Sequence, residues 1–260
     1  MGASGIALTG ANGFIGRHLV NLMSLSGLEH KRLSFRQHDY SEILRQMRNL
    51  KAEGVTNFLN LGWPASSTHD YKNSDENANA SKLSLQLADA CVETGIRFFG
   101  VGSPAESWPG DSEYAKRKSE SREGVRHLIE ANKVTWLRPH LVFDSTSWPK
   151  LVRDAASGIE VVIRDNSRQN FIHVEDVASG IYAAVMHGLS GEVDILSGKT
   201  IRPSELLEAL GYRFRLATDI SKECDAILWK NDSLVQTGWR AMKTEEILGT
   251  HRLGSGNLKN

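Results

Sequence analysis

The chain has 260 residues, and its 31 lysines and arginines balance its 31 aspartates and glutamates, so the formal net charge at pH 7 is zero. This balance excludes a global attraction to nucleic acid or to an anionic membrane, and we expect neither as a partner. Hydrophobic residues form 40% of the chain and charged residues 24%, which is typical of a globular α/β domain, alone or with a small lobe.

Two cysteines, Cys91 and Cys224, lie far apart in the sequence and outside any metal-binding pattern. We therefore expect free thiols in a reducing compartment, with no disulfide and no metal site. No apolar run is long enough to cross a membrane, and the N-terminus leads directly into a strand without room for a signal peptide. The cytoplasm is the expected location.

Strands and helices are expected to alternate through about the first 140 residues. The expected strands cover residues 6–9, 32–35, 55–61, 97–101 and 134–137. The expected helices between them cover residues 17–26, 40–51, 79–94 and 113–132. This alternation predicts parallel strands joined by crossover helices, and therefore an α/β fold with a doubly wound parallel sheet of the Rossmann type.

After residue 144 the alternation ends, and we expect a smaller lobe of mixed structure. Its expected elements are a loop, a short helix and a strand within 145–170, a helix over 174–187, and short helices over 203–210 and 244–248. A further strand, expected over 192–196, could return to the sheet.

A glycine-rich turn, Thr9-Gly10-Ala11-Asn12-Gly13-Phe14-Ile15-Gly16, joins the first expected strand to the first expected helix. Gly10 permits a sharp turn, Gly13 lets the backbone approach a pyrophosphate, and Gly16 lets the helix pack on the strand. The N–H groups and positive dipole end of the helix would face the phosphates. The turn predicts dinucleotide binding, with a plain tight turn between strand and helix as the alternative.

The end of the second expected strand should meet the adenosine ribose of such a cofactor, where an acid favours NAD and a base favours NADP. Arg36 lies there, and the first acid after it is Asp39. Arg36 therefore favours NADP over NAD, with a solvated surface arginine as the alternative.

Tyr114 and Lys118 are four residues apart in an expected helix, so their side chains share one face. A lysine ammonium beside a phenol stabilises the phenolate, which lets Tyr114 exchange a proton near neutral pH. Ser103 directly follows the expected strand 97–101, at the sheet edge where such folds bind ligands, so its hydroxyl could hold a substrate oxygen. The alternatives are a tyrosine packed beside a surface lysine, and a turn serine before a proline.

Along the chain, the glycine turn comes first, then Ser103 after a later strand, then Tyr114 and Lys118 on the next helix. Motifs in this order resemble those of the extended short-chain dehydrogenase/reductases, also called the NAD-dependent epimerase/dehydratase family. The resemblance extends over nearly the whole chain. The matching segments are Thr9–Gly16, Asn60–Trp63, Asn79, Phe98–Glu106, Tyr114–Lys118, Leu137–Pro139 and Asn170–Ala178.

The resemblance implies an NAD(P)-binding Rossmann domain formed by residues 1–145 and 174–197, and a substrate-binding lobe formed by residues 146–173 and 198–260. It also implies NADP or NAD as cofactor, a nucleotide-sugar substrate, and a homodimer formed through two long helices. The helix faces in that dimer would carry Leu83, Leu85, Leu87, Leu128 and Ile129.

The same resemblance implies the roles of individual residues. The expected catalytic residues are Ser103, Tyr114 and Lys118. The expected cofactor-binding residues are Gly10, Asn12, Gly13, Phe14, Ile15, Gly16, Arg36, Leu61, Gly62, Trp63, Asn79, Tyr114, Lys118 and Pro139. The expected substrate-binding residues are Ser103, His140 and Arg168.

The chain departs from the family pattern at three places, one of which is a shorter segment from Ser103 to Tyr114. Members that dehydrate sugars carry an Asp-Glu pair directly after the catalytic hydroxyl residue, where this chain has Pro104 and Ala105, so a dehydratase is disfavoured. Where the family often has an arginine for the substrate diphosphate, this chain has Gln169, and the neighbouring Arg168 could substitute.

His173 is expected to be a hydrogen-bonded structural histidine rather than a catalytic one.

These features predict a reductase that acts on the ketone of a nucleoside-diphosphate 4-keto-6-deoxy sugar. Tyr114 would donate the proton, Lys118 would tune Tyr114, and Ser103 would orient the carbonyl oxygen. A nucleotide-sugar epimerase with a retained NAD uses the same three residues and is left open. The other alternative is a non-catalytic NADP-binding or redox-sensing protein, which would not need the tyrosine–lysine pair.

Overall fold

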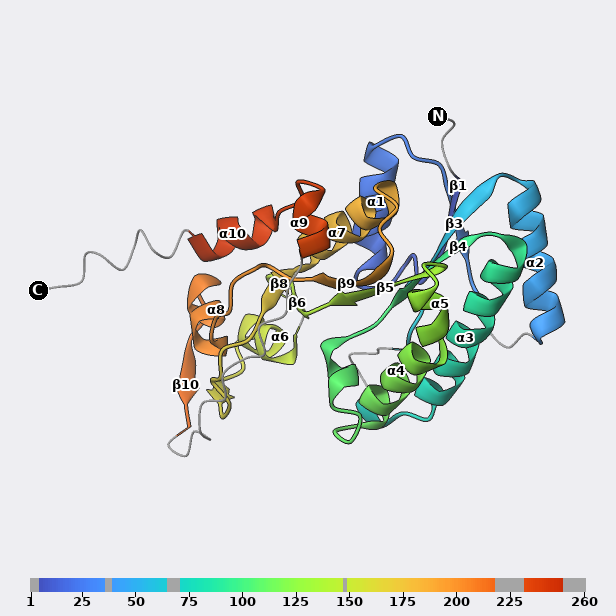
Figure 1. The fold of residues 1–260 in the computed structure, drawn as a ribbon. Coiled ribbons are helices and arrows are strands. Elements are labelled where there is room, and N and C mark those ends of the chain that lie inside the picture. Colours follow the sequence, from blue (N-terminus) through green and yellow to red (C-terminus); the bar gives the residue numbers. More distant parts are fainter. Residues whose placement is uncertain (1–4, 36–38, 65–70, 147–148, 218–231, 250–260) are drawn as a thin grey trace, which may run out of the picture. The chain divides into compact units, whose positions relative to one another are not determined.

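The computed structural model describes residues 5–35, 39–64, 71–146, 149–217 and 232–249 (Figure 1). Arg36 and Cys224, both singled out from the sequence, lie outside these ranges. The chain divides into two compact units, the first formed by residues 1–139 and 181–193 and the second by residues 140–180 and 194–260. Each unit has its own hydrophobic core.

A six-stranded sheet in the order β2-β1-β3-β4-β5-β9 forms the centre of the first unit (Figure 1). Its strands are β1 (Gly5–Thr9), β2 (His30–Leu33), β3 (Val55–Asn60), β4 (Arg97–Val101), β5 (Val134–Pro139) and β9 (Gly191–Ile195). From β2 to β5 the neighbouring strands pair in parallel. The order reverses between β1 and β3, so the predicted doubly wound sheet is confirmed, and β9 returns to it.

Helices cover both faces of this sheet. Helix α1 (Gly16–Leu25) lies on one face, and α2 (Tyr40–Ala52), α3 (Glu76–Thr94) and α4 (Glu113–Gly124) pack side by side on the other (Figure 1). No helix within the described ranges combines the length and the apolar character needed to cross a membrane.

The sequence accounts for helix α2 residue by residue. Asp39 precedes it, and the Asp39 side chain accepts a hydrogen bond from Glu42 N at 2.9 Å, which caps the first turn. Ile43, Met47 and Leu50 recur at helical spacing and are buried in the core. The helix expected here is confirmed.

The single helix expected over residues 113–132 is wrong, because α4 ends at Gly124 and a short α5 (Arg126–Glu130) follows. A Cβ on Gly124 would lie only 2.6 Å from Leu85 Cδ2, so α4 closely approaches a side chain of α3 at this point. Glycine is a poor helix former, which favours an interruption at this point. Helix α3 also begins before the expected Asn79, at Glu76.

The five residues expected to form a dimer face contribute to the core of the first unit, and the homodimer itself stays a prediction. Three of them are buried, and the other two are partly buried and pack against the same core. An apolar stripe on these helices is explained by packing within one chain. The five residues are Leu83, Leu85, Leu87, Leu128 and Ile129.

Aromatic side chains fill the centre of the same core. The rings of Phe58 on β3 and Phe98 on β4 stack with their centroids 6.2 Å apart, and Trp136 on β5 is fully buried. Cys91 lies in this core as a free thiol, with its Sγ 3.7 Å from Met47 Sδ, and burial raises the pKa of the thiol. A structural role as a small apolar side chain follows for Cys91.

The second unit has two small parallel sheets, one pairing β6 with β8 and the other pairing β7 with β10. Its strands are β6 (Leu141–Phe143), β7 (Val161–Ile163), β8 (Phe171–His173) and β10 (Phe214–Leu216). Its helices are α6 (Lys150–Ala156), α8 (Pro203–Ala209), α9 (Asp232–Gln236) and α10 (Met242–Gly249), together with the first half of α7 (Val174–Met186). The predicted smaller mixed lobe is thus present after β5.

Asp176, in the first turn of α7, caps helix α10. Its buried carboxylate accepts hydrogen bonds from Lys243 N at 3.0 Å, Thr244 N at 2.6 Å and Thr244 Oγ1 at 2.5 Å. We expect Asp176→Ala to lower the free energy of unfolding by about 2–4 kcal/mol, because buried donors lose a charged acceptor. Urea denaturation measures this change. The exposed neighbour variant Glu175→Gln should stay within about 0.5 kcal/mol of wild type; equal stability of the two variants would contradict the capping role.

Candidate active site

The carboxyl ends of β1 and β3 meet where the strand order reverses, and buried hydrogen bonds connect them. Thr9 Oγ1 donates to Asn60 Oδ1 at 2.7 Å, and Gly62 N donates to Thr9 Oγ1 at 3.0 Å. Asn60 Nδ2 in turn donates to Ser84 Oγ of α3 at 3.1 Å. Because doubly wound sheets bind their ligands at such a reversal, these contacts form the frame of a candidate ligand site.

The glycine turn leaves no room for side chains. Gly10 has a φ of 67°, and a Cβ there would lie 2.6 Å from the carbonyl of Leu61. A Cβ on Gly16 would lie 2.0 Å from Gly10 O, and Gly13 N closes the turn by donating to Gly10 O at 2.9 Å. Within the described part of the chain, no side chain caps α1. The turn therefore offers backbone N–H groups and a positive helix end, which fits the pyrophosphate of a dinucleotide.

The structure brings most of the expected cofactor-binding residues to this place. The glycine turn, with Asn12 exposed on it, lies against the loop that begins at Leu61. The Arg17 guanidinium lies over the Phe14 ring, 5.6 Å from its centroid. The role expected for Arg36 concerns a residue outside the described part of the chain.

Lys118 is buried although it carries an ammonium group. Its Nζ donates to Val101 O, at the end of β4, at 2.6 Å and lies 3.7 Å from the centroid of the Trp63 ring. Burial lowers the pKa of Lys118 to about 7, while the charge of Glu106 acts in the opposite direction and raises it. Lys118 can therefore exchange its proton near neutral pH.

Trp63, Tyr114 and Lys118 form a compact cluster. The Tyr114 ring meets Trp63 edge to face, with ring centroids 6.1 Å apart, and Lys118 Nζ lies 5.8 Å from the Tyr114 ring centroid. Trp63 Nε1 donates to Asn77 Oδ1 at 2.7 Å, which fixes the indole against α3. Three residues expected at the site from the sequence are thus close together, with a cation beside the phenol ring.

Ser103 follows β4 and caps a single turn of 3₁₀ helix, η2 (Pro104–Ser107). Ser103 Oγ accepts a hydrogen bond from Ala105 N at 3.2 Å, and Ser103 N donates to Glu106 Oε2 at 3.3 Å. Helix α4, which carries the tyrosine and the lysine, packs against η2. Because the capping contact uses only an oxygen lone pair of Ser103, its hydroxyl hydrogen can be directed to a substrate oxygen.

Glu106 was not predicted as a site residue, yet it places a buried carboxylate behind Ser103. Trp136 Nε1 donates to both carboxylate oxygens, at 3.1 and 3.3 Å, and Oε1 lies 3.6 Å from an Arg138 nitrogen and 3.8 Å from Arg122 Nε. Burial has the largest effect and holds the pKa of Glu106 above its usual value, although the Trp136 and Ser103 hydrogen bonds and the charge of Arg138 act to lower it. The surrounding donors and cations thus offset part of the cost of burying the ionised carboxylate.

One sequence signal could have identified Glu106. Ser103 and Glu106 are three residues apart, with a proline between them, which fits a capping box in which the glutamate turns back to the serine N–H. The contacts with Trp136 and Arg138 have no such signal, because those residues come from β5 and meet Glu106 only in the folded sheet.

Two other expected cofactor-binding residues, Asn79 and Pro139, differ in exposure. Asn79, expected to open a helix, is exposed within α3, and the fully buried asparagine of this region is Asn77, which holds Trp63. Pro139 ends β5 and is buried. The expected helix start at Asn79 is therefore corrected to Glu76.

The two expected substrate-binding residues of the second unit differ in exposure. His140 is buried, with its Nε2 3.5 Å from Asp194 Oδ1. Arg168 is exposed, and its guanidinium donates to Thr200 O at 3.0 Å and lies 3.3 Å from Glu205 Oε1. The guanidinium of Arg168 thus already contacts a carbonyl and a carboxylate, and the negative charge of Glu205 opposes an incoming anion.

His173 is the structural histidine that the sequence predicts. It is buried, its backbone N–H donates to Thr244 Oγ1 at 2.8 Å, and its ring Nδ1 accepts from the backbone N–H of Glu175 at 3.3 Å. Over the residues that the structure describes, no three His, Cys, Asp or Glu side chains gather in a way that could hold a metal ion.

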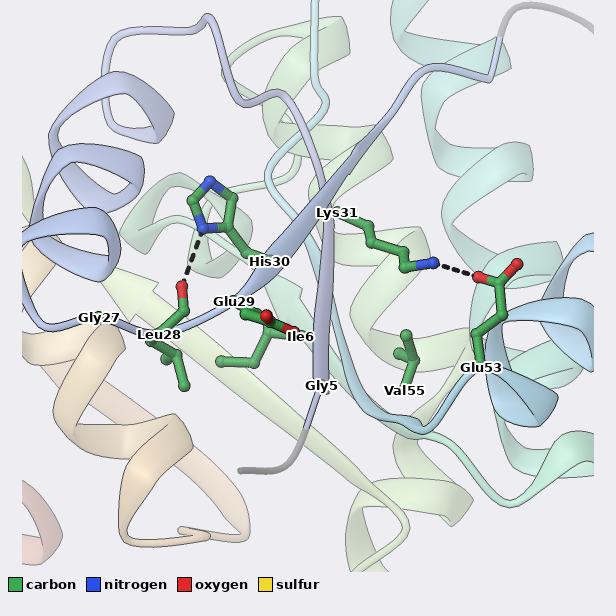
Figure 2. A pocket seen from close by; sticks show the side chains of 9 residues that line it. All are labelled: Gly5, Ile6, Gly27, Leu28, Glu29, His30, Lys31, Glu53 and Val55. Carbon is green, nitrogen blue, oxygen red and sulfur yellow. Dashed lines mark hydrogen bonds and ion pairs between the residues drawn. The ribbon is translucent and has the colours of Figure 1, made fainter. Parts of the chain in front are cut away.

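A hollow of about 450 Å³ opens at the amino-terminal ends of the strands, where β1, β2 and β3 begin (Figure 2). Lys31 and Glu53 form an ion pair on its wall, and His30 Nδ1 lies 3.2 Å from Leu28 O. Gly5, which also lines it, directly follows residues 1–4, which lie outside the described ranges. This hollow lies at the amino ends of the strands, away from the glycine turn, so it is not part of the candidate site.

The burial of Lys118 predicts how stability depends on pH. The pKa of a lysine in an unfolded chain is about 10.4, and that of Lys118 in the folded protein is about 7. At a pH between these two pKa values, Lys118 holds a proton in the unfolded state that it lacks in the folded state. The free energy of unfolding should therefore rise with pH by up to about 1.4 kcal/mol per unit. Lys118→Met should remove this contribution. Urea denaturation across this range tests it, and equal pH slopes for wild type and variant would contradict it.

Comparison with known proteins connects this geometry to a family. Residues 6–196 match the model of the NAD dependent epimerase/dehydratase family. A ceramide reductase of Caulobacter vibrioides is 27% identical over 211 residues, which are 73% of this chain and 63% of that protein. The match therefore spans less than two thirds of the length of that relative.

Solved structures share the fold at low sequence identity. A dTDP-4-dehydrorhamnose reductase from Bacillus anthracis, in complex with NADP, has a TM-score of 0.71 and 14% identity over 95% of this chain and 97% of that chain. A UDP-N-acetylglucosamine 4-epimerase from Bacillus cereus has a TM-score of 0.68 and 19% identity over 96% of this chain and 99% of that chain.

The family match begins in β1 and ends just after β9, so it includes the complete parallel sheet, the glycine turn and the Trp63, Tyr114 and Lys118 cluster. The chain belongs to the NAD dependent epimerase/dehydratase family, a group of NAD(P)-dependent enzymes among the short-chain dehydrogenase/reductases.

Proposed function

We propose that this protein is an NAD(P)-dependent reductase of the ketone in a nucleoside-diphosphate 4-keto-6-deoxy sugar. The observation that carries the proposal is the buried Lys118 ammonium beside the Tyr114 ring, on a helix that packs against the turn capped by Ser103. Such a cluster equips a phenol to exchange a proton near neutral pH, which a non-catalytic binding protein does not need.

The glycine turn and the loop from Leu61 to Trp63 would hold the cofactor, with the pyrophosphate at the start of α1. When bound, the reduced nicotinamide supplies a hydride for the carbonyl carbon. NADP is proposed over NAD on the basis of Arg36 in the sequence. The first unit would thus bind the cofactor, and the second would supply the substrate lobe.

The chain's own residues handle the oxygen and its proton. The Ser103 hydroxyl donates a hydrogen bond to the carbonyl oxygen and holds it beside the Tyr114 hydroxyl. Tyr114 gives its proton to this oxygen as negative charge develops there, and the resulting phenolate is stabilised by the Lys118 cation until solvent restores the proton. One ketone, one hydride and one proton give one alcohol.

The residues beside Ser103 favour reduction over dehydration. Pro104 and Ala105 carry no ionisable group, and Glu106, the acid of this turn, is buried and bound to Trp136. Water elimination from a sugar needs an exposed acid and base beside the reacting carbons. In the second unit, Arg168 is proposed to bind the substrate diphosphate after exchanging its contact with Glu205.

A lipid ketone is a second candidate substrate, and a specific observation favours it. The second unit contains a hollow of about 300 Å³ whose lining is mostly apolar and includes Leu141, Leu151, Val161, Ile163 and Phe171. An aliphatic chain suits such a surface better than a sugar does. The relative from Caulobacter vibrioides, whose name is ceramide reductase, points the same way.

The test is an assay of the purified protein with NADPH and, separately, NADH. The substrates are a panel of nucleoside-diphosphate 4-keto sugars and a long-chain keto lipid, with nicotinamide absorbance and product followed together. Loss of absorbance matched by new sugar alcohol is the expected result. Reduction of the lipid alone would establish the second candidate, and an isomerised sugar at constant absorbance would establish an epimerase.

A further inference from the structure

We propose that Glu106 is a positioning residue of this site: its buried carboxylate fixes the backbone of Ser103 and supplies the negative charge that keeps Lys118 cationic beside Tyr114. The inference rests on the proposed function for its effect on catalysis. Its effect on Lys118 can be measured without any reaction.

The geometry links Glu106 to both residues through one short segment. Lys118 Nζ donates to Val101 O at 2.6 Å, and two residues later Ser103 N donates to Glu106 Oε2 at 3.3 Å. Between them, a Cβ on Gly102 would lie 2.6 Å from Glu106 Oε2, so the carboxylate contacts this segment directly. Glu106 and Lys118 thus hold adjacent parts of the same backbone.

The charges around Glu106 explain why its loss would act on Lys118. Arg122 from α4 and Arg138 from β5 face the carboxylate, and Glu192 from β9 contacts both guanidiniums, at 2.5 and 3.1 Å. The two carboxylates therefore balance the charge of the two guanidiniums. The Lys118 ammonium adds one further positive charge to this group. Without the Glu106 charge, one guanidinium would be uncompensated, and a further buried cation would become less favourable.

This environment is also well shielded from solvent. The Glu106 side chain is 1% exposed and the Arg138 side chain 8% exposed, while Lys118 is covered by the Trp63 ring. Charges interact more strongly here than on the surface, because water screens them less. The phenol of Tyr114, a titratable group on the same helix, also faces Lys118, whose Nζ lies 5.8 Å from the ring centroid.

The experiment is an NMR titration of the Lys118 ammonium in the cofactor-free protein, made with 15N-labelled lysine. The signal is assigned by its absence from Lys118→Met. In wild type it should titrate with a midpoint of about 7, and in Glu106→Gln the midpoint should fall by about one pH unit. Glu106→Asp, which keeps the charge with a shorter reach, should lower it by less.

A control separates the Glu106 charge from the general loss of a carboxylate. Glu120→Gln removes an exposed carboxylate from the helix that carries Lys118. It should keep the wild-type midpoint. An unchanged midpoint in Glu106→Gln would overturn the inference. If that variant does not fold by circular dichroism, an unchanged midpoint in Glu106→Met, which has a similar shape and no charge, would overturn it.

Turnover supplies a second readout. Reduction needs charged Lys118, so activity should fall as pH rises through the titration midpoint of Lys118. In Glu106→Gln this fall in activity should move to lower pH, by the same amount as the midpoint measured by NMR. Well below both midpoints, the variant should approach wild-type activity. A uniform loss at every pH would instead show a purely structural role. If no ketone is reduced by wild type, the proposed function fails while the titration still decides the role of Glu106.

Discussion

Replacing Tyr114 with phenylalanine should reduce turnover roughly a thousandfold while the protein stays folded and still binds its cofactor. The variant removes only the hydroxyl that donates the proton. The ring that meets Trp63 edge to face is kept, and so is the buried position of Lys118 beside it. Steady-state rates with NADPH and the best ketone of the panel measure the effect, and quenching of tryptophan fluorescence measures cofactor binding.

Tyr40→Phe is the matched control for this experiment. Tyr40 lies at the start of α2, and its hydroxyl donates to the exposed Glu93 at 3.1 Å, away from the proposed chemistry. It should retain wild-type turnover. If Tyr114→Phe turned over as fast as this control, a phenol proton would not be part of the mechanism.

Replacing Gly16 with alanine should weaken cofactor binding at least about tenfold and lower the free energy of unfolding by about 1–3 kcal/mol. The added Cβ would lie 2.0 Å from Gly10 O, so the backbone of the turn must move. The same turn is proposed to hold the pyrophosphate against the start of α1, and a displaced backbone would misdirect its N–H groups. Fluorescence titration with NADPH and NADH, together with urea denaturation, gives both quantities.

Gly249→Ala provides the comparison for the glycine turn. Gly249 is exposed at the end of α10, and a Cβ there would have no heavy atom within 4 Å. This variant should bind cofactor like wild type and be at least as stable, since alanine favours helices. Wild-type cofactor affinity in Gly16→Ala would rule out the glycine turn as the pyrophosphate site.

The alternation of strands and helices was sufficient to predict the first unit from the sequence. The helical spacing of Ile43, Met47 and Leu50 is a local pattern, and it corresponds to α2. The short segment 55–60, which follows a glycine, corresponds to β3. The second unit was less predictable, because its strands β6, β7, β8 and β10 have three residues each. So short a strand is too brief to show a period of two.

In the candidate site, too, features within one helix or strand end could be predicted from the sequence, whereas contacts between distant segments could not. The spacing of Tyr114 and Lys118 and the position of Ser103 could be read from the chain, because each depends on one helix or on one strand end. The dimer face stays a prediction, since an apolar stripe does not reveal whether it packs only against the chain's own sheet or also against another chain. The network around Glu106 could not be predicted because Trp136 comes from another strand.

The position of β9 at the sheet edge also affects how the protein is made. Strand β5 ends at Pro139, and β9, its neighbour in the sheet, begins at Gly191. A ribosome adds the residues between them in roughly 3–10 seconds, at typical rates of synthesis. During that interval the nascent chain carries an uncovered β5 edge, whose unpaired N–H and C=O groups can pair with other chains.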